Sequence, residues 1–452
     1  MKHSYYKLII LLVSFIVFVI SYEFNFSNPK TWVCLIPITF GLLFYLIVPN
    51  PKNVGVGYIM LNIVFIAKYF MFPFFYVYSN YYSPYNSLIR NESLIFSYFY
   101  ILLEMLLVLT SLRFFYNRHL VKINNFIVSS YSYKLPIAFV FLLTFIYIFS
   151  PVSFSNFSFI LSPNEFVFEK EFQGSTAFIF FIKWGLYIIP LFGFIFFYKK
   201  YVNNPKFYYF VLSVLPLLFS TLFYFSNSRL SILIPLFSFW FVLTKFYSKF
   251  SKLISLYFLA YGLFSMLLLT LIKFFSVSNI NSVSFNYEIG SYFLNSYFHG
   301  IPNISLGIQA ADQYYNNIQF SNILDELFAQ VMFLNDFFNI DDRSNFYFNS
   351  YLGTRSNIVP TLTEASMLFG RYFFWILTPI LTYFICFFDK LSFQTSRIDN
   401  TFVYSFFSVS IGFFIFGNLN LISDSFFTYF IPIFILSYLN RVYIFPSRVI
   451  FK

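Results

Sequence analysis

Charged residues are scarce in this chain and make up only 10% of its 452 residues. A soluble globular domain contains about 25% charged residues, so this composition excludes a soluble protein. Hydrophobic residues account for 59% of the sequence, and they gather in long runs separated by short polar connections. Because a membrane-crossing helix needs about 20 mostly apolar residues, we expect an all-α, polytopic bundle of transmembrane helices.

Cysteine and histidine are nearly absent, with only 2 and 3 copies. Cys34 and Cys386 both fall in apolar runs, which argues against a disulfide framework and against a zinc site. The histidines are far apart in the sequence, and the adjacent pair Asp341 and Asp342 lacks the Asp-x-Asp spacing of metal-dependent sugar transferases. The sequence therefore predicts no metal site.

Nucleotide-binding signatures are missing as well. The chain has no Gly-x-x-x-x-Gly-Lys loop and no Gly-x-Gly-x-x-Gly element after a strand, so we expect no ATP, no NAD and no other cofactor. The formal net charge is +11, but the basic residues follow the connections between apolar runs, as the topology rule for membrane proteins requires. We therefore expect the lipid bilayer as a partner, and no nucleic acid.

Hydropathy identifies about twelve candidate spans of roughly the length needed to cross a bilayer. They cover residues 5–22, 31–48, 54–78, 93–112, 135–150, 177–198, 207–225, 230–246, 253–272, 367–388, 401–422 and 425–443. Basic residues such as Lys199 and Lys249 lie in alternate connections, whereas acids such as Glu92 and Glu165 lie in the opposite ones. Because cytoplasmic connections carry the excess of Lys and Arg, both termini are predicted to be cytoplasmic.

One long segment, residues 273–366, separates the ninth candidate span from the tenth. It follows the basic connection 245–252 by one span, so the charge rule predicts that it lies outside the cell membrane. The sequence thus predicts a single integral membrane domain, residues 1–452, with this extracytoplasmic loop inside it. Within the loop, residues 322–338 carry an apolar stripe opposite a polar face, which indicates a helix lying on the outer membrane surface or packed on the bundle.

Outward-facing arginines are the strongest chemical signal, because they run against the topology rule. A planar guanidinium binds phosphate oxygens through two parallel hydrogen bonds. Such arginines are candidates to bind a diphosphate leaving group in place of a metal ion, and the plainer alternative for each is snorkelling or a local ion pair. The candidate diphosphate-binding residues are Arg229, Arg343, Arg355 and Arg371.

Three residues of the predicted loop are candidates for a catalytic base toward a sugar hydroxyl. His299 can accept a proton near neutral pH, although a lone histidine is more often structural. Glu288 and Glu364 are rival bases, since partial desolvation near the membrane surface would raise their pKa. The sequence alone leaves the choice among the three open.

Three charged residues fall inside candidate spans: Lys68, Glu104 and Lys183. Charged residues at membrane depth usually face the interior of the bundle and pair with one another. We expect Glu104 to pair with Lys68 or with Lys183. Such a pair is either a structural contact between helices or part of a proton or substrate pathway.

Three features together resemble the Wzy-type oligosaccharide repeat-unit polymerases, the family that builds O-antigen and capsular polysaccharide. The first is the overall form, with about twelve spans and one long outer loop in the C-terminal half. The second is the Ser228-Arg229 turn that opens a span. The third is the stretch from Thr361 to Gly370, which is similar to the family's Thr…Phe-Gly element after the long loop and re-enters the membrane at Arg371.

This resemblance implies a glycosyltransferase of the bacterial cytoplasmic (inner) membrane that needs neither metal nor nucleotide. The donor would be a growing glycan on undecaprenyl diphosphate, and the acceptor would be the terminal sugar of a new lipid-linked repeat unit. The implied partners are undecaprenyl-diphosphate-linked oligosaccharides, with a chain-length regulator and a flippase as further candidates.

Two alternatives stay open. An O-antigen ligase or a related lipid-dependent glycosyltransferase would share nearly all of this chemistry. A lipid-linked oligosaccharide flippase or another transporter would also be basic on its cytoplasmic side, but we would expect two similar halves and short outer loops.

Overall fold

The fold is almost entirely helical, which confirms the all-α prediction. A computed structural model describes residues 2–48, 54–118, 132–160, 174–225, 230–277, 287–314, 317–318, 322–328, 331, 337–338, 343–354 and 357–442. Within these residues the exception is one antiparallel pair of short strands, β1 (Phe157–Phe159) and β2 (Phe223–Phe225). The long apolar runs of the sequence therefore form helices, and they leave little of the described chain for strands.

The chain divides into two compact units, each assembled from segments far apart in the sequence. Unit 1 comprises Met1–Lys122, Ser284–Lys390 and Ser408–Phe427, and unit 2 comprises Ile123–Val283, Leu391–Phe407 and Thr428–Lys452. The sequence predicted one membrane domain over residues 1–452, and that assignment stays a prediction.

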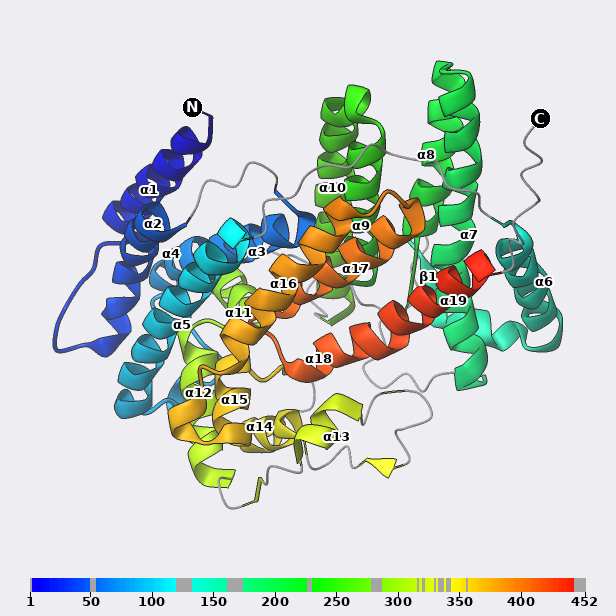
Figure 1. Cartoon of the computed structure of the whole chain (residues 1–452). Coiled ribbons are helices and arrows are strands. Elements are labelled where there is room, and N and C mark those ends of the chain that lie inside the picture. Colours follow the sequence, from blue (N-terminus) through cyan, green and yellow to red (C-terminus); the bar gives the residue numbers. More distant parts are fainter. Residues whose placement is uncertain are drawn as a thin grey trace, which may run out of the picture. The chain divides into compact units, whose positions relative to one another are not determined.

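Unit 1 holds the N-terminal helices and the helices of the predicted outer loop (Figure 1). Its helices are α1 (Lys2–Ile20), α2 (Leu35–Ile47), α3 (Val56–Ile66), α4 (Phe72–Tyr78), α5 (Asn91–Arg118), α11 (Tyr287–Phe298), α12 (Ile301–Tyr314), α13 (Asn322–Phe328), α14 (Ser344–Leu352), α15 (Thr361–Phe369), most of α16 (Leu377–Gln394), the end of α17 (Ile398–Phe414) and α18 (Leu419–Asp424).

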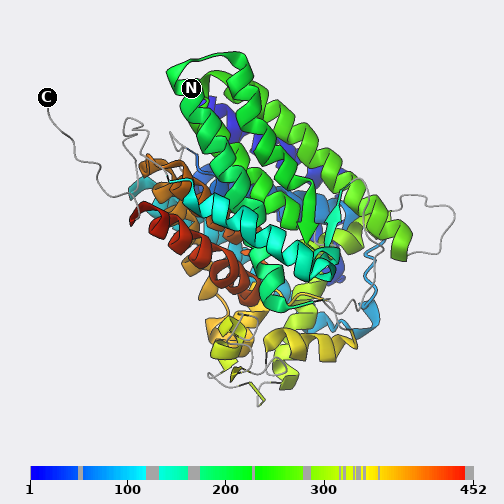
Figure 2. The same cartoon turned by 90° about the vertical axis from the view of Figure 1, so that its right-hand side faces the viewer.

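Unit 2 is a helical bundle in which α7 and α8 pack along each other, as Figures 1 and 2 both show. Its helices are α6 (Lys134–Phe149), α7 (Thr176–Asn203), α8 (Phe207–Thr221), α9 (Leu230–Phe246), α10 (Ser251–Val277), the start of α17 and α19 (Ile431–Val442).

Six helices among the described residues are long and apolar enough to cross a membrane: Pro29–Ile47, Val56–Tyr78, Asn91–Tyr116, Thr176–Asn203, Arg371–Gln394 and Leu419–Asn440. A seventh results if Ser231–Phe246 and Ser248–Ser265, which meet at 114°, form one broken span. Three further apolar helices have only 10–17 residues. These findings support a membrane protein with transmembrane helices, and the count of about twelve spans stays a prediction.

The segment predicted as a long loop, residues 273–366, is largely helical where the structure describes it. Its first residues continue α10 in unit 2, and its remainder supplies α11 to α15 of unit 1, which we call the cap helices. Helix α12 packs against α5, α14 and α15, and residues Ile301–Ala311 along it are all buried. The predicted loop therefore contributes a core element of unit 1.

One expected element of this segment differs from its prediction. Within the described residues the helix expected over 322–338 covers only Asn322–Phe328, as α13. Its buried face carries Asn322 and Glu326, while Leu324 is exposed. The polar face of the helix therefore faces the protein interior, because α13 packs against α18 rather than lying with its apolar stripe on the bundle.

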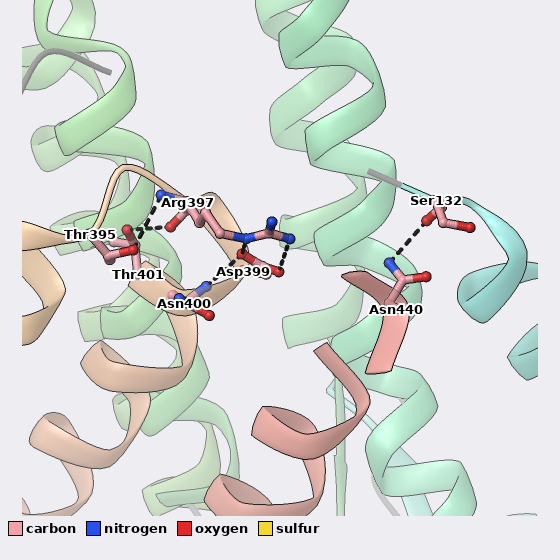
Figure 3. Close-up of polar contacts among 7 residues, drawn as sticks. All are labelled: Ser132, Thr395, Arg397, Asp399, Asn400, Thr401 and Asn440. Atoms are coloured by element: carbon pink, nitrogen blue, oxygen red, sulfur yellow. Dashed lines mark hydrogen bonds and ion pairs between the residues drawn. The ribbon is translucent and has the colours of Figure 1, made fainter. Parts of the chain in front are cut away.

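Two basic residues of unit 2 are hydrogen-bonded around the turn before α17. Figure 3 shows the turn before α17, where Arg397 Nε and Nη2 donate to Asp399 at 3.1 and 2.9 Å. The same figure shows a separate contact, in which Asn440 donates to the Ser132 carbonyl. The Lys245 ammonium donates to the carbonyls of Ser392 and Thr395 at 2.5 and 2.7 Å. These connections are the ones that the charge pattern predicts to be cytoplasmic.

Candidate active site in the cap helices

Glu364 is a fully buried carboxyl group on α15. The helix begins directly after Pro360, whose fixed φ suits a helix start, and places Glu364 in its first turn. Glu364 Oε2 accepts a hydrogen bond of 2.7 Å from the backbone N–H of Leu419, the first residue of α18. Its other oxygen, Oε1, has no hydrogen-bond partner among the described residues. One oxygen is thus anchored and the other is free.

Glu326 on α13 repeats this arrangement. The side chain is fully buried, and Oε1 accepts hydrogen bonds from both the backbone N–H and the hydroxyl of Ser344, the first residue of α14. Within the described part of the chain, Glu326 Oε2 is also without a partner. Two polar contacts hold α13 in place: Asn420 donates to the Glu326 carbonyl at 3.0 Å, and Ser423 donates to the Leu327 carbonyl.

The two carboxyl groups influence each other electrostatically. Burial, followed by the charge of Glu326, raises the pKa of Glu364 well above its usual range. Burial also raises the pKa of Glu326, while the Ser344 donors and the charge of Arg343 oppose that rise. Two buried carboxyl groups that resist losing both protons can supply a general acid and a general base from one site.

The candidate arginines have different surroundings. Arg343 is buried, precedes α14, and its charge acts on Glu326, so it belongs to the carboxyl site. Arg371 is exposed at the break between α15 and α16, with its guanidinium carbon 4.5 Å from the centre of the Phe96 ring. Arg229 and Arg355 lie outside the described residues and stay predictions.

His299 occupies the turn between α11 and α12. Its φ of 54° lies in the left-handed region, which histidine tolerates better than most side chains. Asn295 and Asn303 bridge the turn, with Asn295 Nδ2 donating to Asn303 Oδ1 at 2.9 Å and Asn303 Nδ2 donating to the Asn295 carbonyl at 3.0 Å. The backbone geometry therefore gives His299 a structural role in joining the two helices.

The surroundings of the His299 side chain also weaken its case as the base. Burial, assisted by the charge of Lys68, lowers the pKa of His299 to about 3, and neither ring nitrogen has a partner among the described residues. An imidazole with that pKa is a poor proton acceptor near neutral pH. The remaining candidate, Glu288, is exposed in the first turn of α11. Of the three predicted bases, Glu364 therefore has the most suitable environment.

The predicted charged pair within the spans forms between Lys68 and Glu104. Lys68 Nζ lies 2.6 Å from Glu104 Oε2, both side chains are buried, and the Tyr69 hydroxyl donates to the same oxygen at 2.9 Å. Lys68 also lies 4.0 Å from the centre of the Phe416 ring. Lys183, the other predicted partner, belongs to unit 2, where its ammonium lies 3.6 Å from the centre of the Phe225 ring. These contacts fit a structural pair between α5 and the region after α3.

Sequence reasoning did not single out Glu326. The spacing of apolar residues assigned it to the solvent-facing side of a surface helix, and the structure buries that side. The available signal was the pair Asn322 and Glu326, which are four residues apart and therefore share one helical face. Within the described residues, no group of three or more His, Cys, Asp and Glu side chains is arranged to hold a metal ion.

No protein-family model, no curated protein and no solved structure matches this chain.

Proposed function

We propose that this protein polymerises undecaprenyl-diphosphate-linked oligosaccharide repeat units into O-antigen or capsular polysaccharide at the outer face of the bacterial cytoplasmic membrane. The observation that carries this proposal is the free, buried oxygen of Glu364, next to a second carboxyl group, in the segment with the predicted outer location. A carboxylate works as a base toward a sugar hydroxyl when its pKa is raised toward the working pH. Burial raises the pKa of Glu364 in this direction.

The proposed step transfers a glycan between two lipid carriers. The acceptor hydroxyl oxygen bonds to the anomeric carbon of the donor glycan, and its proton passes to Glu364. The bond between that carbon and the diphosphate oxygen breaks, and undecaprenyl diphosphate leaves with the bonding electrons. No nucleotide is consumed, because the diphosphate ester of the donor drives the transfer.

Cationic side chains are needed for the departing diphosphate. Arg371 is exposed seven positions after Glu364, beyond the end of α15, and Arg343 is buried beside Glu326. A guanidinium that binds the leaving group more tightly as negative charge develops lowers the barrier. We assign Arg371 to the diphosphate and expect Arg343 to act mainly on the carboxyl groups, with Arg229 and Arg355 as further predicted ligands.

The proposed topology has both termini in the cytoplasm and the cap helices outside. Support comes from unit 2, where Lys245 reaches the carbonyls before α17 and the charge of Arg397 acts on Lys199. Basic residues of three connections thus gather around the turn before α17, which supports a cytoplasmic location for these connections. A cysteine placed at Asn317, near the end of α12, in an otherwise cysteine-free variant should react with an impermeant maleimide in intact cells or spheroplasts.

One observation favours a second function. The buried Lys68–Glu104 pair lies within candidate spans, where charged pairs also serve proton and substrate pathways. A lipid-linked oligosaccharide flippase is therefore the second candidate. An O-antigen ligase would use the same carboxyl chemistry and differ only in its acceptor.

Deletion of the gene distinguishes these functions. A cell without a polymerase still exports its repeat unit, so we expect surface glycan of a single repeat and no ladder. Loss of all surface glycan, with repeats retained on the cytoplasmic leaflet, would indicate the flippase. Long chains that stay on undecaprenyl diphosphate and are not transferred to the final lipid acceptor would indicate the ligase. Purified protein given lipid-linked repeats alone should also build chains, which neither alternative would do.

A further inference from the structure

Two buried carboxyl groups of unit 1, Glu326 and Glu364, have the same hydrogen-bonding arrangement. Glu364 and Glu326 each use one oxygen to accept from the N–H that begins a helix, and each leaves the other oxygen buried and without a partner among the described residues. A buried polar atom without a hydrogen bond is costly, and native proteins rarely tolerate one. Two such atoms in one site suggest a common cause.

Two ionised carboxyl groups cannot form a hydrogen bond with each other, because each can only accept. A protonated carboxyl group can donate to a carboxylate, so one proton between the two groups would give both free oxygens a partner. Consecutive residues of α18 hold the two groups, because the Leu419 N–H donates to Glu364 Oε2 and the Asn420 side chain donates to the Glu326 carbonyl. The Ser344 hydroxyl lowers the pKa of both carboxyl groups, and the charge of Glu326 raises the pKa of Glu364. The two groups therefore lie in one local environment.

The charged residues around Glu326 and Glu364 do not oppose a proton between the two groups. Arg343 and Asp325 both act on Glu326, and their charges have opposite sign. The other charged residues that we find on the described elements packed against the pair are Asp312 on α12, Arg371 after α15 and Asp424 on α18. Neither Asp312 nor Arg371 is among the groups that shift the pKa of either carboxyl group.

We propose that Glu326 Oε2 and Glu364 Oε1 share one proton, and that Glu326 is the positioning residue that sets the protonation state of Glu364. This inference rests on the proposed function for its catalytic meaning. When the shared proton lies on Glu326, Glu364 is the carboxylate that accepts the proton of the acceptor sugar. The pair then holds two protons, and one must leave to the solvent before the next transfer.

The test is an infrared titration of the full-length protein in detergent, which follows the protonated carboxyl band without any substrate. The variants are Glu326→Gln and Glu364→Gln, in which the amide oxygen can still accept from Ser344 or Leu419. In the wild type we expect a band that persists after the exposed carboxyl groups have ionised. In each variant the remaining carboxyl should titrate about one pH unit or more below the upper step of the wild type, and the shift should be reciprocal.

Reciprocity is the decisive result. If each substitution removes its own band and leaves the titration of the other carboxyl unchanged, the groups are independent and the shared proton is refuted. Asp389→Asn is the matched control, because that buried carboxyl is bonded to the N–H groups of Gly57 and Tyr58 and to the hydroxyls of Tyr116 and Ser408. It should leave both titrations where they were.

A second variant covers the case in which a glutamine variant does not fold. Ser344→Ala removes a hydroxyl that holds down the pKa of both carboxyls, so both titrations should rise together. A rise in only one of them would contradict the shared site. Because these readings need no glycan, reciprocal titrations in a protein that builds no chains would overturn the polymerase and keep the pair, whereas chain formation with independent titrations would do the reverse.

Discussion

The two units of the chain bury their polar side chains differently. Among the described residues, every buried side-chain nitrogen or oxygen without a hydrogen-bond partner lies in unit 1, on Ser21, Trp32, Tyr76, Asn86, Tyr100, His299, Ser305, Glu326 and Glu364. Unit 2 also encloses polar groups, but they are bonded: the half-buried Lys245 has three oxygen partners, and the buried Asp399 accepts from Arg397 and from the N–H of Asn400.

Under the proposed function, we infer that this difference separates a unit that supports the fold from a unit that carries out the chemistry. A unit that only holds a fold together gains by pairing each buried polar group, since each lost hydrogen bond costs about 1–3 kcal/mol. Proteins keep unpaired groups where a ligand, a water or a proton completes them. We therefore expect substitutions in the cap helices of unit 1 to change chemistry, and substitutions at bonded sites to change stability.

The largest effect should come from Glu364→Gln. Removing a general base lowers the rate by about 10²–10⁴-fold, while the glutamine oxygen can keep the hydrogen bond from Leu419. The measurement is chain formation by purified protein from lipid-linked repeats, expressed per folded molecule. Asp399→Asn in unit 2 is the control and should lower the melting temperature more than the rate. Equal rate losses in the two variants would end the distinction between the units.

Breaking the Lys68–Glu104 pair should have the next largest effect, on stability. Glu104→Leu leaves the Lys68 ammonium buried without its carboxylate, and removal of one partner of a buried pair costs about 3–5 kcal/mol. The double variant Lys68→Met with Glu104→Leu should recover most of the lost melting temperature, with chains of normal length. A stable double variant that exports no glycan would instead assign the pair to a transport pathway and favour the flippase.

Stability should depend on pH in unit 1. Glu364 has a raised pKa in the folded protein, so as pH rises past about 4.3 the unfolded chain loses this proton first. The free energy of unfolding therefore falls progressively from that pH up to the raised pKa of Glu364 in the folded protein. The wild-type melting temperature should fall over that window, and Glu364→Gln should flatten the fall. An equally steep curve in the variant would show that other groups cause the dependence.

His299→Asn should have the smallest effect. Asparagine tolerates the left-handed backbone of this turn, so chain formation should stay within about twofold of the wild type if His299 serves only the turn. His299→Val, with a branched side chain at the same φ, should lower the melting temperature. A rate loss of about 10²-fold in the asparagine variant, the size expected for a lost general base, would restore histidine as the base.

The sequence could predict those features that depend on local chemistry. Apolar runs predicted the helices, and the rarity of charge inside spans predicted that Glu104 would pair with Lys68 or Lys183, of which the structure selects Lys68. Glu364 was a candidate because it lies near the end of the predicted outer segment, where partial desolvation at the membrane surface would raise its pKa. Glu326 was not, because a short amphipathic helix does not reveal which face is covered. The bonds from Gly57 and Tyr58 to Asp389 join residues more than 300 positions apart, and no local pattern predicts them.

The most direct test is carbodiimide labelling of the purified protein at neutral pH, mapped by mass spectrometry while chain formation is followed. A hydrophobic carbodiimide modifies carboxyl groups that remain protonated in apolar surroundings. We expect the label on Glu364 or Glu326, with activity lost in proportion, and no label on Asp399, whose oxygens are bonded to Arg397. Label on Asp399 but not on the pair, or a labelled pair with full activity, would contradict the assignment of the reacting carboxyl groups to unit 1.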